Sequence, residues 1–181
     1  MNGVRSAQEA SAKKYSLAEV EGNPALFSDS LESEQNCMKL FETVYIDSSA
    51  LVKLYAPETG LDRVLALMNE VGSFTTSVIT YAESRGVFAR LLAQGKMNET
   101  EHMATLTRFD GDWNDINHIP VSPDVYRLAG DLLVAHAGLR AMDAIQMASA
   151  LKVHRTVETA FLTFDKDLLE VARKLMPGQV R

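Results

Sequence analysis

One short stretch constrains the fold of this chain more than any other. Residues 44–46 are β-prone, Asp47 follows them, and two serines, Ser48 and Ser49, come next. Apolar residues then recur at helical spacing. This pattern predicts a buried strand that ends in a carboxylate, and a helix over residues 49–56 that is capped by Ser48 or Ser49. Open α/β sheets hold their chemistry beyond the carboxyl ends of the strands, so Asp47 stands where a catalytic acid is expected.

The rest of the chain alternates between short β-prone runs and longer helical patterns. Further strands are predicted at residues 73–77, 118–121 and 160–164. Helices are predicted at residues 61–68, 79–93, 98–117, 122–137, 141–153 and 165–175. Strands that are separated by helices predict an α/β fold with a mostly parallel sheet and helices on both of its faces.

The first part of the chain does not share this alternation. Gly22, Asn23 and Pro24 interrupt it, and residues 28–36 consist mostly of Ser, Glu and Gln. Such a composition predicts that residues 1–37 form a disordered or loosely attached N-terminal extension. The folded domain is expected at residues 38–181.

Charge and composition exclude several classes of protein. A net charge of −6 over 181 residues argues against a protein that coats nucleic acid through a broad basic face. It is compatible with a nuclease, because an acidic metal site contributes negative charge of its own. The sequence has no apolar run of the ~20 residues that span a bilayer and no secretion signal. With a single cysteine, Cys37, the expected location is a reducing cytoplasm.

Three further carboxylates can join Asp47 at the same edge of the sheet. Glu83 lies early in a predicted helix, Asp143 lies at a helix N-terminus, and Asp165 ends the last predicted strand, with Asp167 two residues later. Taken singly, an aspartate at a helix start is most often a cap or a partner of the helix dipole. Glu83 alone is most simply a surface residue. Asp47 is the hardest to explain in this way, because a buried strand leads straight into it.

The combination points to a metal. Carboxylates that share a cleft repel each other and raise one another's pKa unless cations neutralise them. Mg²⁺ or Mn²⁺ suits such a site, since each binds a few carboxylates together with water and substrate phosphate. One or two such ions can activate water and stabilise the charge of phosphodiester cleavage.

Four motifs of this chain resemble those of the PIN-domain family, and specifically of the VapC-type toxins of bacterial and archaeal toxin–antitoxin pairs. The motifs occupy residues 46–55, 80–83, 139–150 and 161–168. The similarity covers about residues 40–175, in the expected order and spacing. It implies a PIN-like three-layer α/β/α domain with a mostly parallel central sheet of four or five strands.

The resemblance also implies an activity and a site. The activity would be that of a Mg²⁺- or Mn²⁺-dependent endoribonuclease. Carried over by position, the acidic quartet would act as metal ligands and catalytic groups: Asp47, Glu83, Asp143 and Asp165. Residues in supporting roles would be Ser48 or Ser49, and Thr163, while Asp167 would support the site or only cap the last helix.

Partners follow from the same resemblance. RNA would be the substrate, and a cognate antitoxin would lay a segment with a basic residue across the acidic cleft, where an Arg or Lys can replace the metal as neutraliser. Members of the family also tend to form homodimers. Apolar residues on the predicted helices could supply a dimer surface or belong to the core: Leu61, Met68, Leu91 and Leu92.

Two alternatives remain open at the level of the sequence. A phosphatase of the haloacid-dehalogenase type also begins with a strand and an aspartate, but it needs a second aspartate two residues on, where this chain has Ser49. A non-catalytic RNA-binding scaffold with the same fold is the other alternative. The intact quartet disfavours it.

Overall fold

Four short strands form one parallel sheet in the order β3-β2-β1-β4. The central strand β1 (Thr43–Ile46) pairs with β2 (Phe74–Ser77) on one side and with β4 (Thr159–Leu162) on the other. The edge strand β3 (Asn117–Ile119) pairs with β2. All three pairings are parallel, which confirms the predicted α/β class and places the carboxyl ends of all four strands at one edge.

This computed structural model describes residues 41–56, 59–71 and 73–181. The extension predicted at residues 1–37 lies outside the described residues, as do residues 38–40 of the predicted domain. Within the described part, a fifth strand is represented only by a parallel bridge between Phe161 and Val180, near the C-terminus. None of the helices described there is long and apolar enough to cross a membrane.

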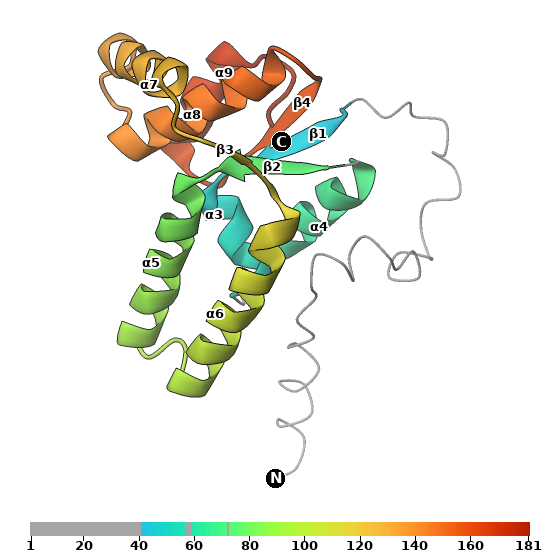
Figure 1. Cartoon of the computed structure of the whole chain (residues 1–181), viewed down its shortest axis with the longest axis vertical. Helices are drawn as coiled ribbons and strands as arrows, with labels where there is room; N and C mark the ends of the chain where they lie inside the picture. Colours follow the sequence, from blue (N-terminus) through green and yellow to red (C-terminus); the bar gives the residue numbers. More distant parts are fainter. Residues whose placement is uncertain (1–40, 57–58, 72) are drawn as a thin grey trace.

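Helices and two short 3₁₀ turns connect the strands (Figure 1). Between β1 and β3 they are α3 (Ser48–Leu51), η2 (Val52–Leu54), α4 (Leu61–Glu70), α5 (Ile79–Ala93), α6 (Glu99–Asp112) and η3 (Trp113–Asp115). After β3 they are α7 (Pro123–Ala135), α8 (Ala141–His154) and α9 (Lys166–Leu175).

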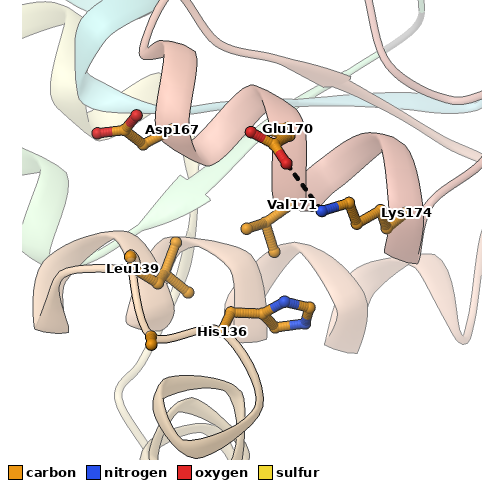
Figure 2. A pocket seen from close by; sticks show the side chains of 8 residues that line it. His136, Leu139, Asp167, Glu170, Val171 and Lys174 are labelled. Carbon is orange, nitrogen blue, oxygen red and sulfur yellow. Dashed lines mark hydrogen bonds and ion pairs between the residues drawn. The ribbon is translucent and has the colours of Figure 1, made fainter.

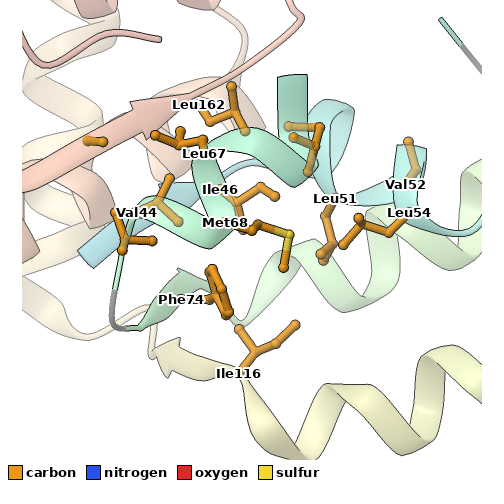
Figure 3. Packing of buried hydrophobic residues seen from close by; sticks show 14 of the residues in the cluster. Val44, Ile46, Leu51, Val52, Leu54, Leu67, Met68, Phe74, Ile116 and Leu162 are labelled. Atoms are coloured by element: carbon orange, nitrogen blue, oxygen red, sulfur yellow. The ribbon is translucent and has the colours of Figure 1, made fainter. Parts of the chain in front are cut away.

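Each face of the sheet has its own core, because successive side chains of a strand point to opposite faces. Val44 and Ile46 of β1 lie in one cluster with Leu67 and Met68 of α4 (Figure 3), and residues of α5 and α6 belong to the same cluster. Tyr45 of β1 and Phe161 of β4 point the other way and pack with α7, α8 and α9. Tyr45 and Phe161 also stack on each other, with ring centroids 5.7 Å apart. The two cores make the three layers that the sequence predicted.

Two of the predicted helices are markedly shorter in the structure. The helix predicted at residues 49–56 is the single turn α3 followed by η2, and its N-cap is Asp47, not Ser48 or Ser49. The helix predicted at residues 98–117 ends at Asp112, because Ile116 is drawn into the core and residue 117 opens β3.

The last strand also ends earlier than predicted. β4 stops at Leu162, so Thr163 and Phe164 belong to the connection between β4 and α9. The physical reason is visible in the hydrogen bonds. The backbone N–H of Phe164 donates to the Ser49 hydroxyl at 2.8 Å, a contact outside the sheet. This connection therefore becomes part of the carboxyl edge.

Candidate functional site

The acidic residues reach the carboxyl edge of the sheet from separate elements. Asp47 follows β1, and Asp165 closes the connection after β4. Glu83 lies in the second turn of α5, which follows β2, and Asp143 lies in the first turn of α8. Because all four strands are parallel, these positions share one side of the molecule.

Asp47 is held by two hydroxyl relays that start at backbone N–H groups of the β4–α9 connection. In one relay, Phe164 N–H donates to the Ser49 hydroxyl, which donates to Asp47 Oδ1 at 2.8 Å. In the other, Asp165 N–H donates to the Thr163 hydroxyl at 3.0 Å, which donates to Asp47 Oδ2 at 3.0 Å. The relays attach the end of β1 to the start of α9.

The Asp47 carboxylate also caps its own helix. It accepts a hydrogen bond from Ala50 N–H at 3.1 Å, and the side chain is only 3% exposed. Burial raises the pKa of Asp47 from 3.8 to about 7, although the hydrogen bonds from Ser49, Ala50 and Thr163 act in the opposite direction. Desolvation is the dominant cause, so the ionised form is costly here in the absence of a cation.

Glu83 is half-buried and has a dedicated donor. Gln146 of α8 donates from Nε2 to Glu83 Oε2 at 2.6 Å, and a hydrogen bond from Ser48 also favours the ionised form. Burial nevertheless raises the pKa of Glu83, and the charge of Asp143 raises it further. Ser48 and Ser49 thus serve different acids: Ser48 contacts Glu83, and Ser49 contacts Asp47.

Asp143 and Asp165 lie near each other across the gap between α8 and α9. Burial raises the pKa of Asp143, and the charges of Asp165 and Asp167 add to the effect. Asp143 also accepts from the backbone N–H of Arg140 at 3.3 Å. Asp165 caps α9 by accepting from the N–H groups of Asp167 and Leu168, both at 2.9 Å. The alternative in which Asp167 caps the last helix is therefore wrong; Asp167 is an exposed residue of the first turn.

Charge coupling links the acids, but they do not converge. The charge of Asp143 raises the pKa of Glu83, and the charge of Asp165 raises the pKa of Asp143. In the part of the chain that the structure describes, no three His, Cys, Asp or Glu side chains are gathered closely enough to hold one metal ion. The chemistry of the donor set nevertheless fits a hard cation: all four are carboxylates, and three have a pKa raised by burial or like charge.

A cavity of about 330 Å³ borders this edge, between α9 and the loop that joins α7 to α8 (Figure 2). Leu139 and Val171 supply apolar contacts, and His136, Asp167 and the Glu170–Lys174 ion pair supply polar ones. The cavity adjoins the acidic residues through Asp167. Asp47, Glu83, Asp143 and Asp165 are not among the residues that line it.

Gln146 is the residue of this site that sequence reasoning missed. It lies within the motif at residues 139–150, where it resembles one more position of a helical pattern. Its side chain is only 1% exposed and is the one glutamine in the buried part of α8. A polar side chain on the buried face of a helix was the available signal, because such groups need specific partners.

Replacing Thr163 by valine tests how far the hydroxyl relay supports an ionised Asp47. Hydrogen bonds to charged groups contribute about 1.5–3 kcal/mol, and neutral ones about 1 kcal/mol. Asp47 is ionised above pH 7 and protonated well below it. In EDTA, Thr163→Val is therefore expected to lower the free energy of unfolding by about 2–3 kcal/mol at pH 8, and by about 1 kcal/mol at pH 5.

Urea unfolding at the two pH values measures this difference. Thr105→Val is the matched control, because the Thr105 hydroxyl is buried in α6 and has no hydrogen-bond partner among the described residues. The control should show the same small effect at both pH values. An equal loss for Thr163→Val at pH 5 and pH 8 would show that the relay does not stabilise the charge.

Comparison with known proteins shows which family this chain is similar to. A family model of the PIN domain matches residues 44–174. Ribonuclease VapC45 of Mycobacterium tuberculosis is 35% identical over 114 residues, which cover 61% of this chain and 76% of that protein. Ribonuclease VapC47 of the same species is 33% identical over 147 residues, which cover 76% of this chain and 99% of that protein.

Solved structures agree on the fold. A toxin–antitoxin complex from Klebsiella pneumoniae superposes with a TM-score of 0.51 at 18% identity, covering 76% of this chain and 95% of that one. FitAcB from Neisseria gonorrhoeae gives a TM-score of 0.51 at 20% identity, covering 71% of this chain and 92% of that one. At these identities the likeness concerns the fold.

Proposed function

This chain belongs to the PIN-domain family, and within it to the VapC-type ribonucleases, so we propose that its carboxyl edge hydrolyses RNA phosphodiester bonds. It is a toxin endoribonuclease of a toxin–antitoxin pair. The acidic residues of this edge are Asp47, Glu83, Asp143 and Asp165.

The state of Asp47 is the observation that supports the site most strongly. A carboxylate that is 3% exposed, with a pKa raised to about 7, costs stability unless a cation neutralises it. A residue needed only as a helix cap could be Ser or Asn at no such cost. Ser49 and Thr163 both donate to it, which orients its lone pairs while leaving its charge in place.

Asp47, Glu83, Asp143 and Asp165 are the residues that would hold a divalent cation. Bound Mg²⁺ or Mn²⁺ would supply Lewis acidity and a water molecule of lowered pKa for an in-line displacement at phosphorus. The other residues of the chain position these carboxylates. Ser49 and Thr163 orient Asp47. Ser48 and Gln146 orient Glu83, and the N-terminus of α9 holds Asp165. Burial of Asp47 also keeps bulk water from screening its charge.

Metal removal tests the proposal directly. Purified protein incubated with a mixed-sequence RNA and Mg²⁺ or Mn²⁺ is expected to produce fragments, and an excess of EDTA should reduce the rate by at least about 10³-fold, since metal catalysis contributes several kcal/mol. Cleavage that survives in EDTA would contradict the proposal. Binding of RNA by metal-loaded protein without fragments would favour the scaffold alternative instead.

We further propose that the antitoxin partner inserts a basic side chain at this edge. An arginine guanidinium can donate to two carboxylates at once, which would offset the charges that raise the pKa values of Glu83 and Asp143. Co-expression with the antitoxin should therefore suppress RNA cleavage. An antitoxin in which the inserted basic residue is replaced by alanine should still bind but should inhibit more weakly.

A homodimer is also proposed, with α5 and α6 as its surface. Figure 1 shows these two helices projecting together from the sheet. Met103 of α6 is 61% exposed, and Leu91 and Leu92 of α5 are half-buried, whereas Met68 is 3% exposed and belongs to the core. Light scattering should therefore report a dimer that Met103→Lys weakens.

A further inference from the structure

The amide of Gln146 is the centre of a buried hydrogen-bond network that spans four elements of the fold, β1, β2, α5 and α8. Its Oε1 accepts from the Tyr45 hydroxyl at 2.7 Å. Its Nε2 donates to the Thr80 hydroxyl at 2.8 Å and to Glu83 Oε2 at 2.6 Å. Tyr45 and Thr80 are fully buried, and Gln146 is 1% exposed.

The direction of every hydrogen bond in this network is determined. Thr76 donates to the backbone carbonyl of Ile46 at 2.6 Å, so its only proton is used there. Thr80 must therefore donate to Thr76 at 2.8 Å, and its own oxygen can accept from Gln146. This leaves Gln146 with one N–H for Thr80 and one for Glu83.

The network connects two of the proposed metal ligands. One end is the carbonyl of Ile46, the residue that immediately precedes Asp47. The other end is the Glu83 carboxylate. A flipped amide is disfavoured, because its oxygen would face the Glu83 carboxylate and the Thr80 hydroxyl, whose only proton is donated to Thr76.

We infer that Gln146 is a positioning residue, which holds the Glu83 carboxylate at the orientation and depth that divalent-metal binding at the carboxyl edge requires. The inference rests on the proposed function. A purely structural amide could satisfy Tyr45 and Thr80 without a third contact. Here the remaining N–H of Gln146 donates to the half-buried carboxylate of Glu83. Groups that orient metal ligands typically contribute about 10–100-fold to metal affinity.

The test is the dissociation constant for Mn²⁺, measured by electron paramagnetic resonance without RNA. Gln146→Met keeps the size of the side chain and removes both donors, and it is expected to weaken Mn²⁺ binding about 10–30-fold. In a Glu83→Gln background the same substitution should change Mn²⁺ binding by less than about 2-fold, because Gln146 then has no carboxylate to position. The stability control is Thr105→Val, which should leave Mn²⁺ affinity unchanged.

Tyr45→Phe provides a second variant. It releases the amide at Oε1 but leaves both N–H donors, so we expect about 2–5-fold weaker Mn²⁺ binding with a folded circular dichroism spectrum. It decides the question if Gln146→Met fails to fold. Wild-type affinity in Gln146→Met, or in Tyr45→Phe when the first variant is unfolded, would overturn the inference.

Two other results would also overturn it: effects of Gln146→Met and Glu83→Gln that simply add, or an equal loss in Thr105→Val. Failure of the proposed function looks different, because the wild-type protein would then neither bind Mn²⁺ nor cleave RNA. That result would remove the inference together with the proposed function.

Discussion

Replacing Asp47 by asparagine is expected to abolish RNA cleavage and, at the same time, to make the metal-free protein more stable. The loss of activity follows from the loss of a charged metal ligand, and it should be on the order of 10³-fold in kcat/KM. The shape of the side chain is preserved. Asn Oδ1 can still accept from Ala50 N–H, and Nδ2 can donate to the Thr163 hydroxyl, which lies 3.0 Å from Asp47 Oδ2.

The gain in stability follows from the pKa of Asp47. Burial raises this pKa from 3.8 to about 7, so between about pH 4 and pH 7 the folded protein retains a proton that the unfolded chain has released. The wild-type free energy of unfolding therefore falls as the pH rises through this window, and it levels off above pH 7. Asparagine removes the titration, and the variant should be more stable by about 2–4 kcal/mol at pH 8 and unchanged near pH 4.

Urea unfolding in EDTA at several pH values, together with RNA cleavage in Mg²⁺, measures both effects on the same samples. Adding Mg²⁺ should raise the unfolding midpoint of the wild type and leave that of Asp47→Asn unchanged, because only the wild type keeps the charge that pairs with the cation. A variant that is inactive but less stable than the wild type at pH 8 would contradict the assignment of Asp47 as a buried, unneutralised carboxylate.

Substitutions of Asp165 are expected to have the second largest effect on activity. They also distinguish the structural role of this residue from its chemical role. Its carboxylate accepts two backbone N–H groups at the start of α9 and also raises the pKa of Asp143. Asparagine is as good an N-cap as aspartate, and alanine is not. Asp165→Asn should therefore keep the free energy of unfolding within about 0.5 kcal/mol, whereas Asp165→Ala should lower it by about 1 kcal/mol.

Both variants should lose RNA cleavage to a similar extent, on the order of 10²-fold, since both remove the charge. Asp131→Asn is the control, because it removes one carboxylate charge at an exposed position of α7 that belongs to no part of the proposed site. Its rate should change less than about 3-fold. If Asp165→Asn retained full activity, Asp165 would be a helix cap and nothing more.

The local signals in the sequence were sufficient for the fold and for the element beside which each acid lies, but not for the distances between the acids. Strand and helix periods are properties of neighbouring residues, so the parallel α/β arrangement and the strand that leads into Asp47 could be predicted directly. The ends of elements could not be predicted as well. By residue type, either Asp165 or Asp167 can cap a helix. Asp165 is the cap in the structure, because β4 ends at Leu162 and the residues that follow form hydrogen bonds with the end of β1.

Gln146 shows most clearly what only the tertiary structure decided. Its partners Tyr45 and Thr80 are 101 and 66 residues away in the sequence, and the amide becomes informative only when β1, α5 and α8 are packed together. A carboxylate after a strand is a local pattern, and it predicts a candidate site from residue types alone. Three properties of each acid depend on groups from distant parts of the chain: its burial, its hydrogen-bond donors and the repulsion from neighbouring carboxylates. The reason is that desolvation, hydrogen bonding and charge act through space.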